Sequence, residues 1–136
     1  MRNFFIFLFA LTFYNICLFS SDNTWKKIFE IKDQITFYVS TNDILEKDGY
    51  VYFWELINYS VKDEYGDFSA KIYIQGDCKE NRFKWKKISY HKSQMAKDKK
   101  IALEPSNLYK DWHYPKAKTT SNMILDYVCN AIGISI

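Results

Sequence analysis

Hydrophobic and polar residues alternate along much of the chain, in short runs separated by turn residues. Alternation with a period of two is typical of strands that have one buried face. Runs of this kind, rich in aromatic and β-branched side chains, fill the chain between residues 25 and 90. The pattern predicts strands at residues 25–31, 35–40, 50–59, 68–75 and 82–90.

The run at residues 50–59 is apolar on both of its faces. A strand with this pattern is typically central in its sheet and covered on two sides. Residues 41–45 predict a short turn or a single helical turn before it, and residues 47–49 predict a tight turn. We therefore expect residues 50–59 in the middle of an antiparallel sheet.

The last predicted strand contains a change of phase. Phe83 and Trp85 lie on one face, whereas Ile88 and Tyr90 fall on the opposite phase. A β-bulge inserts one extra residue into a strand and so reverses the phase after it. A bulge near residues 86–87 is predicted to bring all four side chains to the same side.

After the strands, residues 95–107 are polar, rich in lysine and closed by Pro105, and they predict a loop. Residues 119–132 are the best helix candidate, with Thr120 or Ser121 as the N-cap. The sequence thus predicts an α+β fold, a single antiparallel sheet of about five to six strands with a C-terminal helix packed on it. The residues at helical spacing on one side are Ile124, Tyr127, Val128 and Ala131.

The amino terminus has the pattern of a secretory signal peptide. Arg2 supplies a positive start, residues 4–14 form an almost continuous apolar run, and no acidic residue precedes Asp22. A membrane-spanning helix needs about 20 apolar residues, more than this run provides. We predict a signal peptide at residues 1–20 and one exported domain at residues 21–136, in the periplasm or at the cell surface. Membrane association is expected only if the signal segment stays uncleaved.

Cleavage after Ser20 removes Cys17 and leaves two cysteines, Cys78 and Cys129. In an exported protein, two cysteines without a third thiol are most simply explained by one disulfide. The alternative is a pair of thiols on a metal, but two histidines and no CxxC pair make a poor zinc site. We expect one disulfide that pins the helix to the sheet, no metal and no cofactor.

No arrangement of residues predicts a reaction. His91 and His113 are the only histidines, and neither lies in a motif of a nucleophilic triad. Glu55 lies inside the apolar strand, where a carboxylate needs a partner or a raised pKa. A structural ion pair is the ordinary explanation of Glu55, and a catalytic acid is the alternative. We predict that the protein is not an enzyme; a small hydrolase that uses Glu55 or His113 is the least favoured hypothesis.

Charge is distributed unevenly along the chain. Residues 79–118 hold 12 basic and 4 acidic side chains, whereas residues 21–78 hold 6 basic and 11 acidic ones. Interleaved basic and aromatic residues are typical of nucleic-acid binders, but an exported protein is expected to meet acidic glycans, acidic proteins or anionic lipids instead. The alternative is a solvated sheet face whose lysines protect an edge strand. The candidate binding residues are Arg82, Lys84, Trp85, Lys86, Lys87 and Lys92.

Several short motifs follow one another in an order that is known from a family of small exported bacterial proteins. They are Trp25, GYVYFWELINY at 49–59, SAKIYIQGDC at 69–78, SYHKSQM at 89–95, WHYP at 112–115 and a final helix with Cys129. In this order the chain resembles the surface-adhesin protein E family, from Trp25 to about residue 130. It departs from the family pattern at residues 96–98, where glycines are common, and at residues 118–121, where a proline-glycine stretch usually precedes the helix.

The resemblance implies an antiparallel sheet with a C-terminal helix, tied by a Cys78–Cys129 disulfide. It also implies a cell-envelope protein, since the family's namesake is an adhesin that binds host matrix and serum proteins and forms dimers. We therefore expect a binding module that contacts an extracellular protein or an acidic glycan through the basic, aromatic segment. A homodimer is a further expectation, and a nucleic-acid partner is not expected. A periplasmic structural or stress-linked protein without an external ligand is the main alternative.

Overall fold

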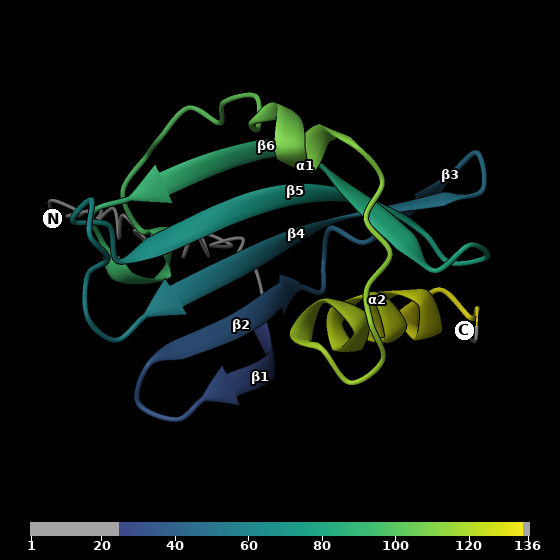
Figure 1. Cartoon of the computed structure of the whole chain (residues 1–136), viewed down its shortest axis with the longest axis horizontal. Coiled ribbons are helices and arrows are strands. Elements are labelled where there is room, and N and C mark those ends of the chain that lie inside the picture. Colours follow the sequence, from purple (N-terminus) through teal and green to yellow (C-terminus); the bar gives the residue numbers. More distant parts are fainter. Residues whose placement is uncertain (1–24, 135–136) are drawn as a thin grey trace, which may run out of the picture.

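A six-stranded antiparallel sheet forms the body of the molecule in a computed structural model, which describes residues 25–134 (Figure 1). The spatial order is β1-β2-β4-β5-β6, and β3 pairs with the same edge of β4 as β2 does. The strand at the centre of this order is the one that is apolar on both faces. The strands are β1 (Trp25–Ile31), β2 (Ile35–Ser40), β3 (Leu45–Lys47), β4 (Tyr50–Tyr59), β5 (Ser69–Asp77) and β6 (Arg82–His91).

The structure confirms the five predicted strands and adds β3, which the sequence pattern did not indicate. β3 has three residues, all exposed, so it has no buried face that would produce an alternating pattern. It is held by a tight hairpin to β4, in which Asp48 and Gly49 both have positive φ, 54° and 81°. An Asp-Gly pair is favoured in such two-residue turns because both positions need the left-handed region.

The predicted β-bulge is confirmed in β6. Tyr73 of β5 pairs with Lys87, and the next residue, Ile74, pairs with Trp85, so Lys86 is the extra residue. Without the bulge, the apolar side chains before it and after it would point to opposite faces of the sheet. With the bulge, they point to the same face.

The helix α2 (Thr120–Ala131) packs on one face of the sheet (Figure 1). Its N-cap is Thr119, whose hydroxyl oxygen accepts a hydrogen bond from the backbone nitrogen of Asn122 at 3.3 Å. The prediction of Thr120 or Ser121 as the cap was wrong by one or two positions, because both already lie in the helix. The buried side chains of the helix are Ile124, Leu125, Val128 and Cys129.

Two features bring α2 close to the sheet. Gly76 of β5 faces Leu125, and a Cβ at this position would lie 2.8 Å from the Leu125 Cδ1 atom and 2.9 Å from a Val51 methyl group. A residue larger than glycine would therefore force the Leu125 or Val51 side chain to shift. The predicted disulfide joins Cys78, just after β5, to Cys129 in α2, with 5.9 Å between their Cα atoms, and both cysteines are buried.

Two short helical turns lie at the two ends of the segment predicted as a loop, residues 95–107. They are η1 (Gln94–Ala96) and α1 (Asn107–Lys110), both too short to give a periodic pattern. The chain around α1 covers the outer edge of β6, because Leu103 pairs with Ile88 and His113 pairs with Phe83. Backbone pairing at these two points protects an edge strand that would otherwise expose its hydrogen-bonding groups.

The predicted signal peptide, residues 1–20, lies outside the described residues. Within residues 25–134, no helix has the length and apolar character that a membrane span requires. The cleavage site and the possibility of an uncleaved anchor therefore stay predictions.

Candidate binding sites on the two faces of the sheet

Alternate residues of each strand point to opposite faces of the sheet, and the two faces differ in chemistry. In β4, Phe53 and Glu55 face α2, whereas Tyr52 and Trp54 point to the other side. We call the first side the helix face and the second the aromatic face.

Aromatic rings are in contact with one another across the aromatic face. Trp54 and Tyr73 have ring centroids 4.9 Å apart, and Tyr52 and Tyr73 have centroids 6.1 Å apart. Such offset or tilted pairs stabilise a fold by more than the burial of their surface alone would. At the end of the strands, the ring of Tyr50 stacks on Trp112 at 5.7 Å. All these side chains are half-buried, so each keeps part of its ring accessible.

Cations lie over the indole rings of this face. The Lys71 Nζ atom is 4.7 Å from the Trp54 ring centroid, and the Arg82 and Lys84 side chains are 4.4 Å and 4.5 Å from the Trp112 ring centroid. Contacts at these distances are attractive and hold the charged groups in place. The aromatic face consists of Trp25, Tyr50, Tyr52, Trp54, Tyr73 and Trp112, with Lys71, Arg82 and Lys84.

The structure brings three of the candidate binding residues together on this face. Arg82 and Lys84 meet at Trp112, and Lys87 is opposite Tyr73 in the strand register. Arg82 also donates a hydrogen bond to the carboxylate of Asp77 at 3.0 Å, which fixes its orientation. These contacts leave the guanidinium half-buried rather than free to move as a surface arginine does.

Of the other three candidates, Trp85 and Lys86 line a cavity of about 280 Å³ together with Lys84, Lys87 and Tyr73, whereas Lys92 lies apart. Trp85 points to the helix face, where its ring stacks on Tyr109 with centroids 3.9 Å apart. Lys86 is the exposed residue of the bulge. Lys92 lies beyond the end of β6 and binds the Asp67 carboxylate at 2.8 Å. Five of the six candidates are therefore neighbours in space as well as in sequence, and Lys92 is the one that is not.

Residues that the sequence analysis did not select complete the basic character of the aromatic face. A cavity of about 270 Å³ beside Trp54 is lined by Lys71 and by lysines of the 97–100 segment. Strand alternation already places Lys71 on the same face as Tyr73 of β5, so the pattern contained this signal. The approach of the 97–100 segment depends on tertiary structure. The lysines that line the cavity are Lys71, Lys97, Lys99 and Lys100.

A serine, a histidine and an aspartate meet in the same cavity, an arrangement that the sequence analysis did not find. The Ser89 hydroxyl lies 2.9 Å from Nε2 of His91, and Nδ1 of His91 lies 3.0 Å from the backbone carbonyl of Asp98 and 3.3 Å from its carboxylate. Because a carbonyl only accepts hydrogen bonds, the Nδ1 atom of His91 carries a proton and donates it in a hydrogen bond to the Asp98 carbonyl.

These contacts resemble a nucleophilic triad in residue types but differ from one in geometry. The nearer partner of His91 is the backbone of Asp98, and hydrogen bonds from Ser93 occupy the carboxylate and lower the pKa of Asp98 to about 2. Ser89 is only 4% exposed, whereas a nucleophile must reach its substrate. We interpret the arrangement as a clamp that holds the 93–98 segment on β6.

The helix face contains a second cavity, of about 170 Å³, between the sheet and the two helices. One wall is a chain of ring contacts: Trp85 stacks on Tyr109, Tyr109 lies 5.8 Å from His113, and His113 lies 5.7 Å from Phe83. The His113 ring is fixed by its Nε2 atom, 2.9 Å from the Leu108 carbonyl. The aromatic wall is therefore preformed in the domain without a ligand.

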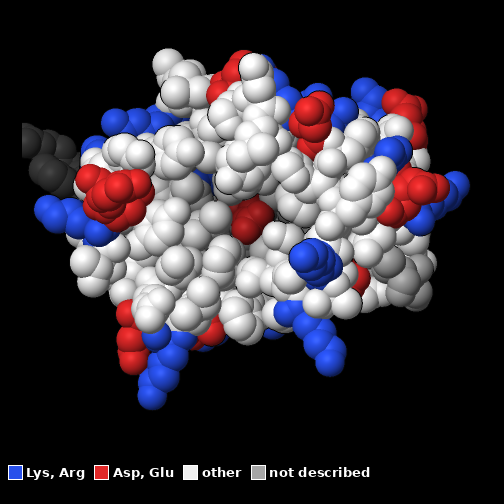
Figure 2. Space-filling view, viewed as in Figure 1, with Lys and Arg blue, Asp and Glu red and all other residues white. Residues whose placement is uncertain are grey.

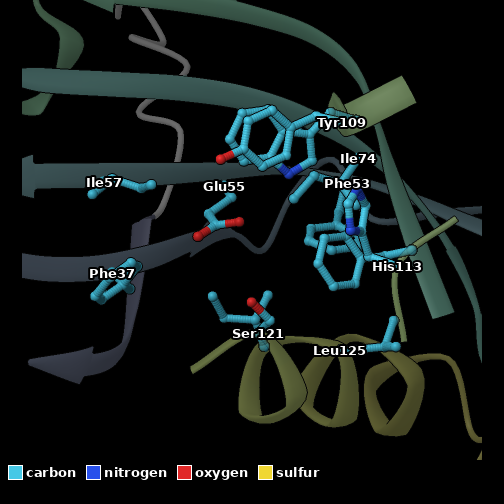
Figure 3. A pocket seen from close by; sticks show the side chains of 12 residues that line it. Phe37, Phe53, Glu55, Ile57, Ile74, Tyr109, His113, Ser121 and Leu125 are labelled. Carbon is cyan, nitrogen blue, oxygen red and sulfur yellow. The ribbon is translucent and has the colours of Figure 1, made fainter. Parts of the chain in front are cut away.

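Glu55 lies on the floor of this cavity (Figure 3). It is 8% exposed, and the structure gives it no hydrogen bond or ion pair within residues 25–134. Burial away from water raises its pKa from 4.5 to about 7. The structural ion pair considered for Glu55 is thus not present among the described residues.

The surroundings of Glu55 are uncharged. Figure 2 shows acidic atoms at the bottom of a hollow, with uncharged atoms over the middle of this side and most charged side chains toward its rim. Figure 3 shows Tyr109 on one side of the Glu55 carboxylate and Ser121 of α2 on the other. His113 lines the same cavity, but its Nε2 atom is engaged by the Leu108 carbonyl rather than by Glu55 or Ser121.

Comparison with known proteins agrees with the resemblance that the motifs indicated. The family model described as surface-adhesin protein E matches residues 25–130, which extend from the first residue of β1 to within one residue of the end of α2. No curated protein matches the chain, and no solved structure matches it. The match thus covers both faces of the sheet and both cavities.

Proposed function

Because the chain belongs to the surface-adhesin protein E family, we propose that it is an exported adhesin-like protein that binds an acidic macromolecule through its aromatic face. The family supports a surface protein that contacts molecules outside the cell. The inference that this partner is acidic is drawn from the side chains of the aromatic face. Dimerisation and the absence of catalysis stay predictions.

The observation that carries the proposal is the placement of cations over aromatic rings. Lys71, Arg82 and Lys84 are held at 4.4–4.7 Å from indole centroids. Ordering these side chains in advance reduces the entropy that a partner must overcome on binding. Carboxylate and sulfate groups of a glycan or an acidic protein match the charges, while the flat rings offer apolar contact between them.

The neighbouring polar cavity extends the same chemistry. Its lysines lie around Trp54 and Lys71, and the one acidic residue in its lining, Asp98, is engaged by Ser93 and faces His91. The local field is therefore positive, and an anionic group that enters the cavity is attracted from several sides.

We expect a Lys71→Gln/Arg82→Gln/Lys84→Gln variant to bind a sulfated glycan such as heparin about tenfold more weakly or worse at low salt. Its affinity should also fall less steeply as salt is added, because fewer charge contacts remain to be screened. Titration calorimetry at two salt concentrations measures both effects, with an acidic protein as a second ligand.

The matched control is a Lys32→Gln/Lys62→Gln/Lys116→Gln variant, which removes the same formal charge outside the aromatic face. If the two variants lose affinity equally, the effect comes from net charge and the proposed face is rejected. Thermal unfolding of both variants shows whether the fold is intact.

Location separates the proposal from the alternative of a periplasmic structural protein. We expect protease added to intact cells to digest the domain, because an adhesin must lie outside to meet its partner. Disrupted cells serve as the control for cleavability. Protection of the domain until the envelope is broken would contradict the proposal and favour a partner inside the envelope.

A further inference from the structure

Glu55 is a buried carboxylate for which the described chain supplies no counter-charge. Neither lysine nor arginine is among the residues that line its cavity. An ionised carboxylate in such a place needs a partner to compensate for the water that it has lost. The cavity opens to the surface on the helix face, as Figure 2 shows, so a ligand can supply that partner.

The walls of the cavity favour a cation of a particular kind. The rings of Trp85, Tyr109 and Phe83 line one side and offer apolar contact to an alkyl chain. Ser121 places a hydroxyl-bearing side chain on the opposite side of the Glu55 carboxylate (Figure 3). Carboxylate and hydroxyl oxygens accept hydrogen bonds, so they suit a cation that carries N–H groups.

The size of the cavity limits the ligand. Its volume of about 170 Å³ is smaller than the roughly 300 Å³ at which pockets for drug-sized molecules begin. A short alkyl chain with one charged group fits this description. A metal ion does not, because no group of three or more potential metal ligands exists within residues 25–134.

We propose that this cavity binds a primary alkylammonium group, with the Glu55 carboxylate as its counter-ion and the Trp85–Tyr109 wall around its alkyl chain. The group belongs either to a small free amine or to a lysine side chain on the surface of a partner. The site lies on the helix face and is independent of the proposed function, which uses the aromatic face.

The probe for the test is n-butylammonium, titrated at pH 8 into the oxidised domain and into a Glu55→Gln variant. Indole signals in NMR spectra report on the site, since Trp85 lines it. We expect millimolar binding to the unaltered domain and about tenfold or weaker binding to the variant, because the amide removes the charge that the ammonium group contacts. A Glu64→Gln variant, altered in an exposed turn, is the matched control and should bind as the unaltered domain does.

Two further probes make the test specific, one uncharged and one with a guanidinium group in place of the ammonium group. n-Butanol has nearly the same shape without the charge, and it should bind at least about tenfold more weakly than n-butylammonium. Equal binding of butanol, or equal binding of n-butylammonium by the Glu55→Gln variant, would overturn the proposal. Equally tight binding of n-propylguanidinium would overturn the preference for a primary ammonium group.

A second readout is the dependence of binding on pH. n-Butylammonium stays charged between pH 6 and 8, as a lysine does, whereas Glu55 becomes ionised in this range. Affinity should therefore rise from pH 6 to pH 8 in the unaltered domain. Tyr109 and His113 are the other titratable side chains of the cavity, and a rise that persists in the Glu55→Gln variant would count against Glu55.

The source of the ammonium group is distinguished by a third ligand, Nα-acetyl-lysine methylamide. Binding of this compound at least as tight as that of n-butylammonium supports a lysine side chain of a partner, because the backbone atoms are then accommodated at the mouth of the cavity. Binding of n-butylammonium alone supports a small free amine. Either result upholds the cavity as an ammonium site, and failure of both ligands overturns it without affecting the test of the aromatic face.

Discussion

Loss of the Cys78–Cys129 disulfide should lower the free energy of unfolding by about 4 kcal/mol, since the bond closes a loop of 51 residues in the unfolded chain. A domain of this length has a modest core, so this change is a large share of its total stability. Urea denaturation of the oxidised domain, of the domain in reductant and of a Cys78→Ala/Cys129→Ala variant measures the effect.

Reduction and replacement by alanine remove the bond in different ways, so together they separate the effect of the cross-link from the effect of packing. Reduction alone keeps both sulfur atoms in the core, whereas the double alanine variant also leaves space beside Leu125 and Val128. We expect the variant to be less stable than the reduced domain and to be insensitive to reductant. Iodoacetamide should label the exported protein only after reduction. Labelling of both cysteines without reductant, or a loss in stability below about 1 kcal/mol, would contradict the assigned role of the bond.

The second large effect concerns Glu55, whose replacement by glutamine should stabilise the domain at alkaline pH. The pKa of Glu55 rises from 4.5 to about 7 on folding, which corresponds to a cost of up to about 3 kcal/mol once the group is ionised. A Glu55→Gln variant avoids this cost while it keeps the shape of the side chain. At pH 8 it should therefore unfold at a higher urea concentration than the unaltered domain.

The direction of the pH dependence follows from proton binding. Below about pH 4.5, Glu55 is protonated in both the folded and the unfolded chain and contributes no difference. Between pH 4.5 and about 7 the folded chain binds more protons, so stability falls as the pH rises, and above this range the contribution is constant. The gain in the variant should thus be small at pH 4.5 and largest at pH 8.

The same exposed-turn variant used above, Glu64→Gln, is the control for general charge effects. Its stability should follow that of the unaltered domain from pH 4.5 to pH 8. Parallel stability profiles for the unaltered domain and the Glu55→Gln variant would show that Glu55 is not a buried, isolated carboxylate. The prediction applies to the domain without an amine, because a bound ammonium group would stabilise the ionised form.

Stability at this position and binding at this position are linked. An ionised Glu55 lowers the stability of the domain without a ligand. Natural proteins commonly keep such destabilising residues where a functional site requires them. This is the physical connection between the pH prediction and the proposed ammonium site. The two are measured separately, the first without ligand and the second by titration.

The regular part of the fold could be predicted from sequence because it depends on local patterns. The strands alternate in burial as their sequences alternate in polarity, and Cys78 and Cys129 are the only pair left if the predicted signal peptide is removed. The bulge at Lys86 was predictable because the apolar phase changes there. In contrast, β3 and α1 have three and four residues and no buried side chain, so they leave no periodic signal.

The candidate sites were only partly predictable, because both are assembled from distant segments. Arg82 and Lys84 were selected from their charge, but their platform, Trp112, comes from the segment that returns along β6. Trp85 was grouped with them as a neighbour in sequence, whereas alternation turns its ring to the helix face. Sequence adjacency thus grouped residues that do line one cavity, but it did not indicate the helix-face cavity that Trp85 also lines.

Sequence alone determined the sheet, the C-terminal helix, the disulfide and the family of this protein, because polarity patterns, cysteine number and the order of motifs are properties of the chain itself. Tertiary structure decided what surrounds Glu55. Whether a buried carboxylate meets a cation depends on which side chains other strands and helices bring to it. Here they bring aromatic rings and a serine from β6, α1 and α2, and no counter-charge from the residues that line the cavity.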